Sequence, residues 1–134
     1  MKNGATTIWE RWDGWTPEKG FQDKGMNSFN HYAYGAVMDW MVSTVAGLEI
    51  ADPGYAKILF KPRPGGTLTW VEATLVTPQG EAAIRWELKD NNLELQFTVP
   101  AGSEATLSLP EGWKGAATAY GPGLHRVVVS QLTA

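Results

Sequence analysis

The spacing of apolar residues changes near Asp52-Pro53-Gly54, and this change constrains the fold more than any other feature of the chain. After residue 53, apolar and polar residues alternate, as they do in strands with one buried face. Six segments show this pattern between turn residues: YAKILFK, TLTWVEATLV, EAAIRWELK, NLELQFTV, EATLSL and HRVVVS. Short antiparallel strands at this spacing predict a mainly β fold, an antiparallel β-sandwich of the jelly-roll-like type.

Turn residues and alternation also predict the hairpins and the core of this sandwich. Asp90-Asn91-Asn92 predicts a tight hairpin. Pro78-Gln79-Gly80 and Pro100-Ala101-Gly102 predict turns within the preceding and the following pair of strands. The side chains expected to point inward are Ile84, Trp86, Leu88, Leu95 and Phe97.

The part of the chain before residue 53 has a different character. Residues 1–27 form an irregular, Trp-rich segment, and residues 28–46 have the apolar spacing of one long α-helix. Asn27 or Ser28 offers an N-cap, and Gly47 stands where a C′ glycine ends a helix. Apolar residues extend around most of this helix, which is typical of a buried helix. The sandwich has room to cover one face, so we expect a homodimer through helix 28–46 to cover another. The alternative is a monomer in which residues 1–27 fold back over that face.

Composition and charge exclude several classes of function. With 134 residues the chain has room for one substantial core, and its net charge of -3 favours neither nucleic acid nor a membrane surface as a partner. There is no cysteine, and His31 and His125 lack metal-ligand spacing, so we expect no metal and no cofactor. The chain shows neither a signal-peptide pattern nor an apolar run long enough to span a bilayer, so a cytoplasmic location is the default expectation.

The string TTIWERWDGW, residues 6–15, is a candidate sugar-binding segment. Indole rings pack on the C–H faces of sugars, and carboxylates act as acids and bases in glycoside hydrolysis. Glu10 lies between Trp9 and Trp12, where a carboxylate is able to act as a general base. The alternative is a packed tryptophan cluster with Glu10 paired to Arg11 at the surface. His31, near the start of the helix, fits either a sugar contact or a contact with a neighbouring loop.

Three strings together resemble one known family. GATTIWERWDGW, MNSFNHYAYGAVMDWM and the segment around FKPRPGG closely resemble the C-terminal portion of bacterial α-L-rhamnosidases of glycoside hydrolase family 78. The resemblance covers essentially the whole chain and is weakest after residue 110. It implies that residues 1–52 are the end of a catalytic (α/α)6 barrel, and that residues 53–134 are the β-sandwich domain that follows it.

The resemblance also implies roles for individual residues. Enzymes of this family hydrolyse terminal α-L-rhamnosides with inversion, using one glutamic acid as the general acid and another as the general base. The base glutamate falls on Glu10, and the substrate-binding histidine falls on His31. Trp9 and Trp12 are then expected to contact the sugar, and the partner of the full-length enzyme is a rhamnose-containing glycoside.

The general acid of the family has no counterpart in this sequence. The family's Asp…Arg-Glu acid loop does not occur in these 134 residues, and the resemblance places most of the barrel upstream. We therefore expect a piece of an α-L-rhamnosidase that is inactive on its own. The alternatives are another (α/α)6 glycosidase and a carbohydrate-binding or structural β-sandwich without catalysis. A binding module would carry exposed aromatic residues on the sandwich, where the tryptophans are Trp70, Trp86 and Trp113.

Overall fold

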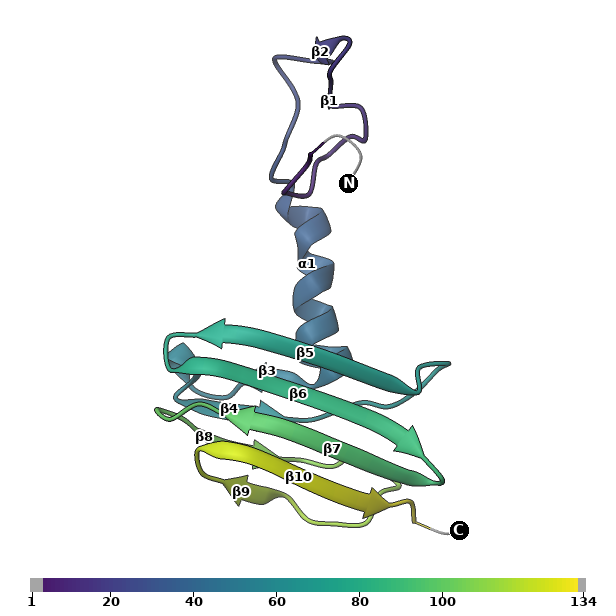
Figure 1. Cartoon of the computed structure of the whole chain (residues 1–134), viewed down its shortest axis with the longest axis vertical. Helices are drawn as coiled ribbons and strands as arrows, with labels where there is room; N and C mark the ends of the chain where they lie inside the picture. The colour runs from purple at the N-terminus through teal and green to yellow at the C-terminus, as the bar shows by residue number, and fades with distance from the viewer. Residues whose placement is uncertain (1–3, 133–134) are drawn as a thin grey trace. The chain divides into compact units, whose positions relative to one another are not determined.

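The computed structural model describes residues 4–132, which form two compact units that divide after Asp39. The first unit contains a two-stranded hairpin of β1 (Trp15–Thr16) and β2 (Gly20–Phe21) within otherwise irregular chain. It ends in α1 (Tyr32–Trp40), whose last residue belongs to the second unit. The elements carry the same labels in Figure 1.

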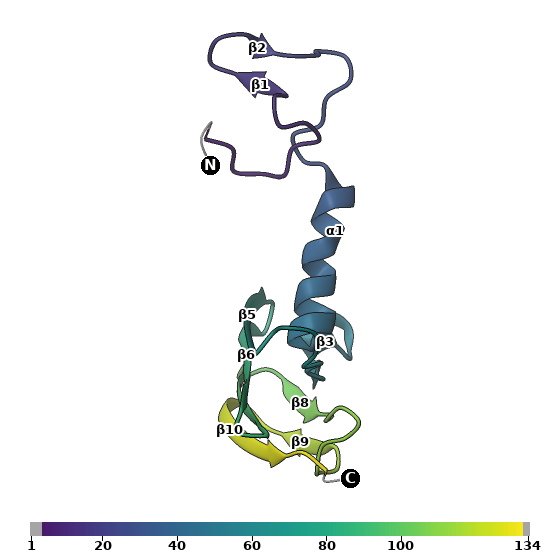
Figure 2. The same cartoon turned by 90° about the vertical axis from the view of Figure 1, so that its right-hand side faces the viewer.

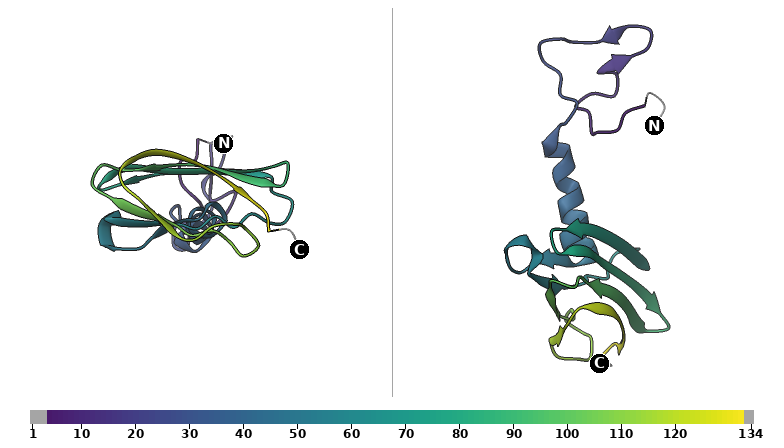
Figure 3. Two further views of the ribbon diagram at one scale, coloured as in Figure 1. Left: turned by 90° about the horizontal axis from the view of Figure 1, so that it is seen from below. Right: turned by 60° about the vertical axis from the view of Figure 1, so that its left-hand side comes forward.

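The second unit is a β-sandwich, which confirms the predicted fold class. Its two four-stranded sheets have the orders β10-β7-β6-β5 and β3-β4-β8-β9. Figures 2 and 3 show them as two facing layers. The strands are β3 (Leu48–Ile50), β4 (Lys57–Phe60), β5 (Trp70–Thr77), β6 (Gly80–Lys89), β7 (Asn92–Val99), β8 (Glu104–Leu107), β9 (Thr118–Tyr120) and β10 (Gly123–Ser130). A 3-10 turn, η2 (Pro53–Tyr55), separates β3 from β4.

The six predicted strands correspond to β4, β5, β6, β7, β8 and β10, but one connection and one strand pairing differ from the prediction. Segment 100–102 does turn the chain, yet it joins β7 to β8, which lie in different sheets. It is therefore a crossover and not a hairpin turn. Strand β8 pairs with β4 instead, and this pair is parallel, with Lys57 opposite Glu104. The other strand pairs within the two sheets are antiparallel.

Both predicted hairpins within the sheet β10-β7-β6-β5 are confirmed. Lys89 pairs with Asn92, so Asp90 and Asn91 form a two-residue loop with φ of 48° and 61°. Asn and Asp tolerate this left-handed conformation, which matches the twist of the flanking strands. At the other end, the Thr77 hydroxyl closes the turn between β5 and β6 by donating to the Gly80 carbonyl at 2.7 Å.

The core lies between the two sheets and contains the side chains expected there. Trp86 and Phe97 are buried with 0% and 1% exposure, and the Phe97 ring packs on Phe60 from the opposite sheet at a centroid distance of 4.8 Å. Ile84 and Leu95 are also buried, and Leu88 is half-buried against the same cluster. Alternation along β6 and β7 therefore predicted the inward face correctly, because each strand contributes every second side chain to the core.

The helix begins later than predicted and ends where predicted. Residues 28–31 are not helical, and α1 starts at Tyr32, with the His31 carbonyl accepting from the backbone N–H groups of Tyr34 and Gly35. Asn27 and Ser28 do not cap it, because their polar groups bond the Trp-rich segment instead. After α1 the chain continues as a π-helical turn, η1 (Met41–Ala46), and ends at Gly47 in the left-handed conformation.

The helix is not buried, in contrast to what its apolar composition suggested. None of the residues of α1 is buried, and Tyr32 is 87% exposed. The turn η1 packs on the sandwich core, through the half-buried Val42 and the buried Ala46. The Trp86 indole N–H donates to the Val45 carbonyl at 3.1 Å, which ties the end of the helical segment to the core.

Replacing Gly47 with alanine is expected to destabilise the sandwich by roughly 2–4 kcal/mol. Gly47 has a φ of 81°, and a Cβ atom there would overlap the backbone of Lys61 and Pro62. The control is Gly66→Ala, because Gly66 has a φ of 61° but open space around it. We expect the control to cost about 1 kcal/mol. Equal losses for the two variants in urea unfolding would show that the close approach at Gly47 is unimportant.

Candidate functional site

The Trp-rich segment is held by backbone pairing with the residues that precede α1. The Glu10 N–H donates to the Ser28 carbonyl at 2.8 Å, and the His31 N–H donates to the Ile8 carbonyl at 2.9 Å. The Thr7 hydroxyl donates to the backbone carbonyl of Phe29, in the segment that also contains Ser28 and His31. Of the four residues predicted for the site, Glu10 and His31 therefore lie on two paired segments within the first unit.

The Glu10 carboxylate has a defined orientation. Its Oε2 atom accepts the Ser28 N–H at 3.2 Å, and the side chain is half-buried. A carboxylate held through one oxygen is able to present the other to a water molecule, which is the arrangement required of a general base. The Arg11 guanidinium donates to the Gln22 side chain at 3.1 Å, and the described residues show no ion pair between Arg11 and Glu10.

The tryptophans beside Glu10 have different environments. Trp9 is half-buried and packs edge-to-face on Phe29, with ring centroids 4.9 Å apart. Phe29 also packs on Phe21 of β2 at 5.6 Å, so Trp9 belongs to a small aromatic cluster. Trp12, in contrast, is 99% exposed. Trp9 therefore stabilises the segment, whereas the Trp12 indole is presented to solvent, where a ligand is able to stack on it.

Two side chains that the sequence did not single out hold the turn that carries Trp12. The Gln22 side chain accepts from Arg11 and donates to the Asp13 carboxylate at 3.0 Å, linking the residues on either side of Trp12. The Asn27 side chain donates to the carbonyl of the buried Gly14 at 2.9 Å. Single amides carry no distinctive spacing in a sequence, so nothing in the pattern pointed to these contacts.

His31 lies at the junction between the paired segments and α1. Its side chain is half-buried, and its ring lies 4.7 Å from the Tyr34 ring.

On the preceding loop, the Asp23 carboxylate accepts the backbone N–H groups of Gly25 and Met26 at 2.8 and 3.1 Å. These two hydrogen bonds favour the charged form and lower the pKa of Asp23.

Two further findings concern metal ions and membrane-spanning helices. Across residues 4–132, no group of three or more His, Cys, Asp or Glu side chains is placed to hold a metal ion. In the same range, no helix is long and apolar enough to cross a bilayer.

Comparison with known families accounts for both parts of the chain. Residues 47–121 match the model of the bacterial α-L-rhamnosidase C-terminal domain. Residues 1–45 match the model of the bacterial α-L-rhamnosidase six-hairpin glycosidase domain. The chain belongs to the bacterial α-L-rhamnosidase family. The resemblance inferred from the sequence is thus confirmed, and the family consists of glycoside hydrolases.

Curated α-L-rhamnosidases are similar to this chain over most of its length. The enzyme from Streptomyces avermitilis is 42% identical over 110 residues, and that from Formosa agariphila is 44% identical over 110 residues. In both cases the match covers 82% of this chain. It covers 11% of the Streptomyces protein and 12% of the Formosa protein, so this chain spans a small part of the length of its relatives.

Solved α-L-rhamnosidase structures contain the same fold. The Streptomyces avermitilis α-L-rhamnosidase complexed with L-rhamnose matches 96% of this chain with a TM-score of 0.70 and 35% identity. The Aspergillus terreus α-L-rhamnosidase matches 92% with a TM-score of 0.70 and 37% identity. Each match covers 14% of the solved chain.

Proposed function

We propose that this chain supplies the general base of an inverting α-L-rhamnosidase, and that Glu10 is that base. The observation that carries the proposal is the half-buried Glu10 carboxylate, held by the Ser28 N–H on the segment pair that also carries His31. His31 is proposed to bond a sugar hydroxyl, and Trp9 and Trp12 to line the sugar pocket. The family membership and the Streptomyces relative solved with L-rhamnose support a rhamnose-containing glycoside as the substrate.

The proposed chemistry follows from the inverting mechanism. The Glu10 carboxylate takes a proton from a water molecule while the water oxygen attacks the anomeric carbon of the rhamnoside. The bond to the leaving oxygen breaks on the opposite face, and a general acid protonates that oxygen. We propose that this acid belongs to another part of a longer enzyme, where carboxyl groups about 6.5–9.5 Å apart would leave room for the water.

The domain organisation is also part of the proposal. Residues 1–52 would be the end of a catalytic (α/α)6 barrel, and residues 53–134 the β-sandwich domain that follows it. The two family matches, to residues 1–45 and 47–121, support a change of domain in this part of the chain. Strand β3 (Leu48–Ile50) pairs with β4 of the sandwich and the C-terminal domain match begins at residue 47, so we propose to move the boundary a few residues upstream of 52.

The purified chain of residues 1–134 is expected to give no turnover of p-nitrophenyl α-L-rhamnopyranoside. The proposed base lacks both a general acid and the walls that would position the sugar, and correct positioning is required for catalysis. Release of p-nitrophenol is the measurement, with Glu10→Gln as the matched control. Turnover above background that the control abolishes would contradict the expectation.

The chain is expected to form a homodimer through helix 28–46, with no nucleic acid or membrane partner. In α1, Tyr32 is 87% exposed, and Val37 and Met38 are each 52% exposed, an apolar surface of the kind that soluble monomers rarely leave in water. Light scattering of the dilute protein measures the mass. A single species at the monomer mass of 14.6 kDa would exclude the dimer. Met38→Lys is expected to shift a dimer toward monomer.

A further inference from the structure

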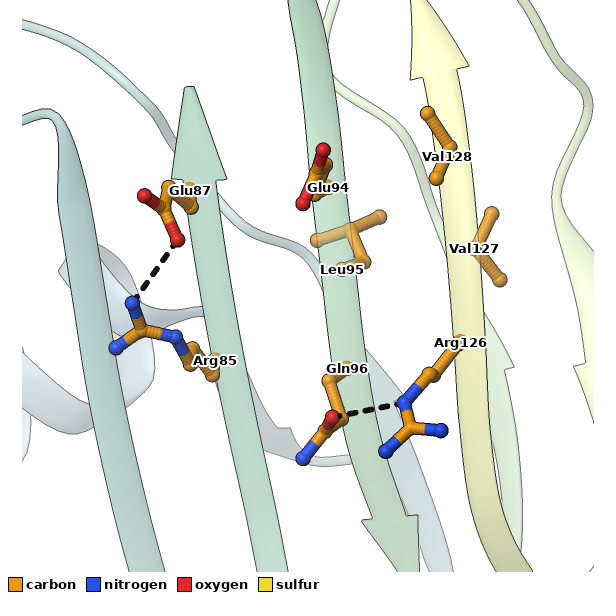
Figure 4. A pocket seen from close by; sticks show the side chains of 8 residues that line it. All are labelled: Arg85, Glu87, Glu94, Leu95, Gln96, Arg126, Val127 and Val128. Carbon is orange, nitrogen blue, oxygen red and sulfur yellow. Dashed lines mark hydrogen bonds and ion pairs between the residues drawn. The ribbon is translucent and has the colours of Figure 1, made fainter. Parts of the chain in front are cut away.

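The outer face of the sheet β10-β7-β6-β5 contains a shallow depression of about 190 Å³. It lies on the side of the sheet that faces away from the core, over three neighbouring strands (Figure 4). Its polar side chains come from β6, β7 and β10. They are Arg85, Glu87, Glu94, Gln96 and Arg126.

The strand register arranges these outward side chains in two rows across the sheet. The first row runs from Glu72 on β5 through Arg85 and Gln96 to Arg126 on β10. The second row contains Trp70, Glu87, Glu94 and Val128. Because side chains directly opposite each other on paired strands are close neighbours, each row is a continuous strip of neighbouring side chains.

The hydrogen-bonding groups of the depression are already oriented. The Arg85 guanidinium donates to Glu87 at 3.0 Å and to Glu72 at 3.4 Å, while Arg126 donates to Gln96 at 3.0 Å. Figure 4 shows the Arg85–Glu87 pair on the strand beside Glu94, and the Arg126–Gln96 pair joining the strand of Glu94 to β10. A guanidinium has five N–H donors, so each arginine keeps donors for a ligand. Groups fixed in this way lose little conformational freedom when a ligand binds.

Trp70 adds an apolar surface to this polar strip. Its side chain is 53% exposed, and the Arg85 guanidinium lies 5.0 Å from the centre of its ring. Trp70 and Arg85 therefore place a flat apolar group and a hydrogen-bond donor side by side. Trp86 on β6 points to the opposite face of the sheet, into the core, and is fully buried. Of these two tryptophans, only Trp70 is available to a ligand.

The mixture of charges discriminates between classes of ligand. An anion attracted to Arg85 and Arg126 would meet the carboxylates of Glu87 and Glu94, and a cation attracted to those carboxylates would meet the arginines. Glu87 and Glu94 stand directly opposite each other, with Glu87 paired to Arg85 at 3.0 Å and Glu94 to Lys89 at 3.8 Å, and carboxylate oxygens keep acceptor capacity for hydroxyl groups. A neutral ligand with adjacent hydroxyl groups satisfies both sets, because each hydroxyl both donates and accepts.

We propose that this outer face, defined by Trp70, Arg85, Glu87, Gln96 and Arg126, binds a neutral sugar unit. Two adjacent hydroxyl groups of a pyranose bond the carboxylate and guanidinium groups, and the C–H face of the ring packs on Trp70. This site belongs to the sandwich and is independent of the function proposed for Glu10. It gives the sandwich a carbohydrate-binding role in addition to its structural role.

The test is an NMR titration of the ¹⁵N-labelled chain with methyl α-L-rhamnopyranoside and, separately, with methyl α-D-glucopyranoside. We expect at least one of the two sugars to give saturable shifts of the amides of β5, β6, β7 and β10. Trp70→Ala is expected to weaken binding, raising the dissociation constant by about tenfold or more. Thr74→Ala is the matched control, because Thr74 is exposed on the same strand but belongs to neither of the two rows, and it should bind like the wild type.

Specific outcomes would overturn the proposal. No shift on these strands with either sugar, or shifts confined to residues 4–39, would show that the sandwich face does not bind a sugar. The second result would still be compatible with the function proposed for Glu10. Sodium acetate giving the same shifts as the sugars would indicate an anion site. If Trp70→Ala does not fold, Arg126→Gln replaces it, because Arg126 is exposed, and an unchanged affinity would overturn the proposal.

Discussion

Trp86→Ala is expected to lower the free energy of unfolding of the sandwich by about 3–5 kcal/mol. The side chain is 0% exposed and lies in the middle of β6, opposite Val71 on one neighbouring strand and Leu95 on the other. Its removal leaves a large cavity, and it leaves the Val45 carbonyl without the indole donor that now bonds it at 3.1 Å. Urea unfolding followed by circular dichroism measures the loss.

A conservative variant separates the contribution of apolar packing from that of the indole hydrogen bond. Trp86→Phe keeps most of the apolar volume but loses the hydrogen bond to Val45, so we expect it to cost about 1–3 kcal/mol. Trp70→Ala serves as the surface control, because Trp70 is 53% exposed. A loss of less than about 1 kcal/mol for Trp86→Ala would show that Trp86 does not support the core.

The sandwich was largely predictable because alternation along a strand reports which side chains face the core. That signal identified the long strands β5, β6, β7 and β10 and the buried positions Ile84, Trp86, Leu95 and Phe97. It does not report which strand is the neighbour. The parallel pairing of β4 with β8, and the crossover at residues 100–102, therefore had no signature in the sequence.

Short elements and side-chain contacts were harder to predict. Strand β3 has three residues, Leu48–Ile50, and such a short segment shows too little alternation to be recognised. The helix start was misplaced because Asn27 and Ser28 are good cap residues, yet their polar groups bond Gly14 and Glu10. A local pattern does not reveal that a distant segment competes for the same hydrogen bonds.

In the site itself, residue types and family resemblance pointed to Glu10 and His31, but not to the contacts that hold them. The backbone pairing of Glu10 with Ser28, and the link that Gln22 makes between Arg11 and Asp13, depend on the folded loop. These contacts join residues nine to eighteen positions apart, and no periodicity predicts them.

Glu10→Gln is expected to lower the turnover of an α-L-rhamnosidase that contains this chain by about 10²–10⁴-fold. Glutamine has nearly the same shape and is able to accept the Ser28 N–H that Glu10 now accepts, but it cannot take a proton from water. The fold should therefore be kept while the base is lost. A suitable enzyme is a chimera in which this chain replaces the matching segment of the Streptomyces avermitilis α-L-rhamnosidase, to which it is 42% identical.

Two controls accompany this variant. Gln22→Ala removes the link between Arg11 and Asp13 without touching the carboxylate, and it is expected to affect KM more than kcat. Thermal unfolding of Glu10→Gln should match that of the unsubstituted chimera, which would assign the lost activity to chemistry and not to folding.

The most direct test of the central claim is kcat of the chimera with and without Glu10→Gln, measured on p-nitrophenyl α-L-rhamnopyranoside, with sodium azide added in a second series. If Glu10 is the general base, the variant loses at least about 10²-fold in kcat, because the attacking water is no longer deprotonated. Azide attacks without a base, so it should restore turnover and give a rhamnosyl azide of inverted configuration. A variant that keeps near-normal kcat without azide would show that Glu10 is not the base.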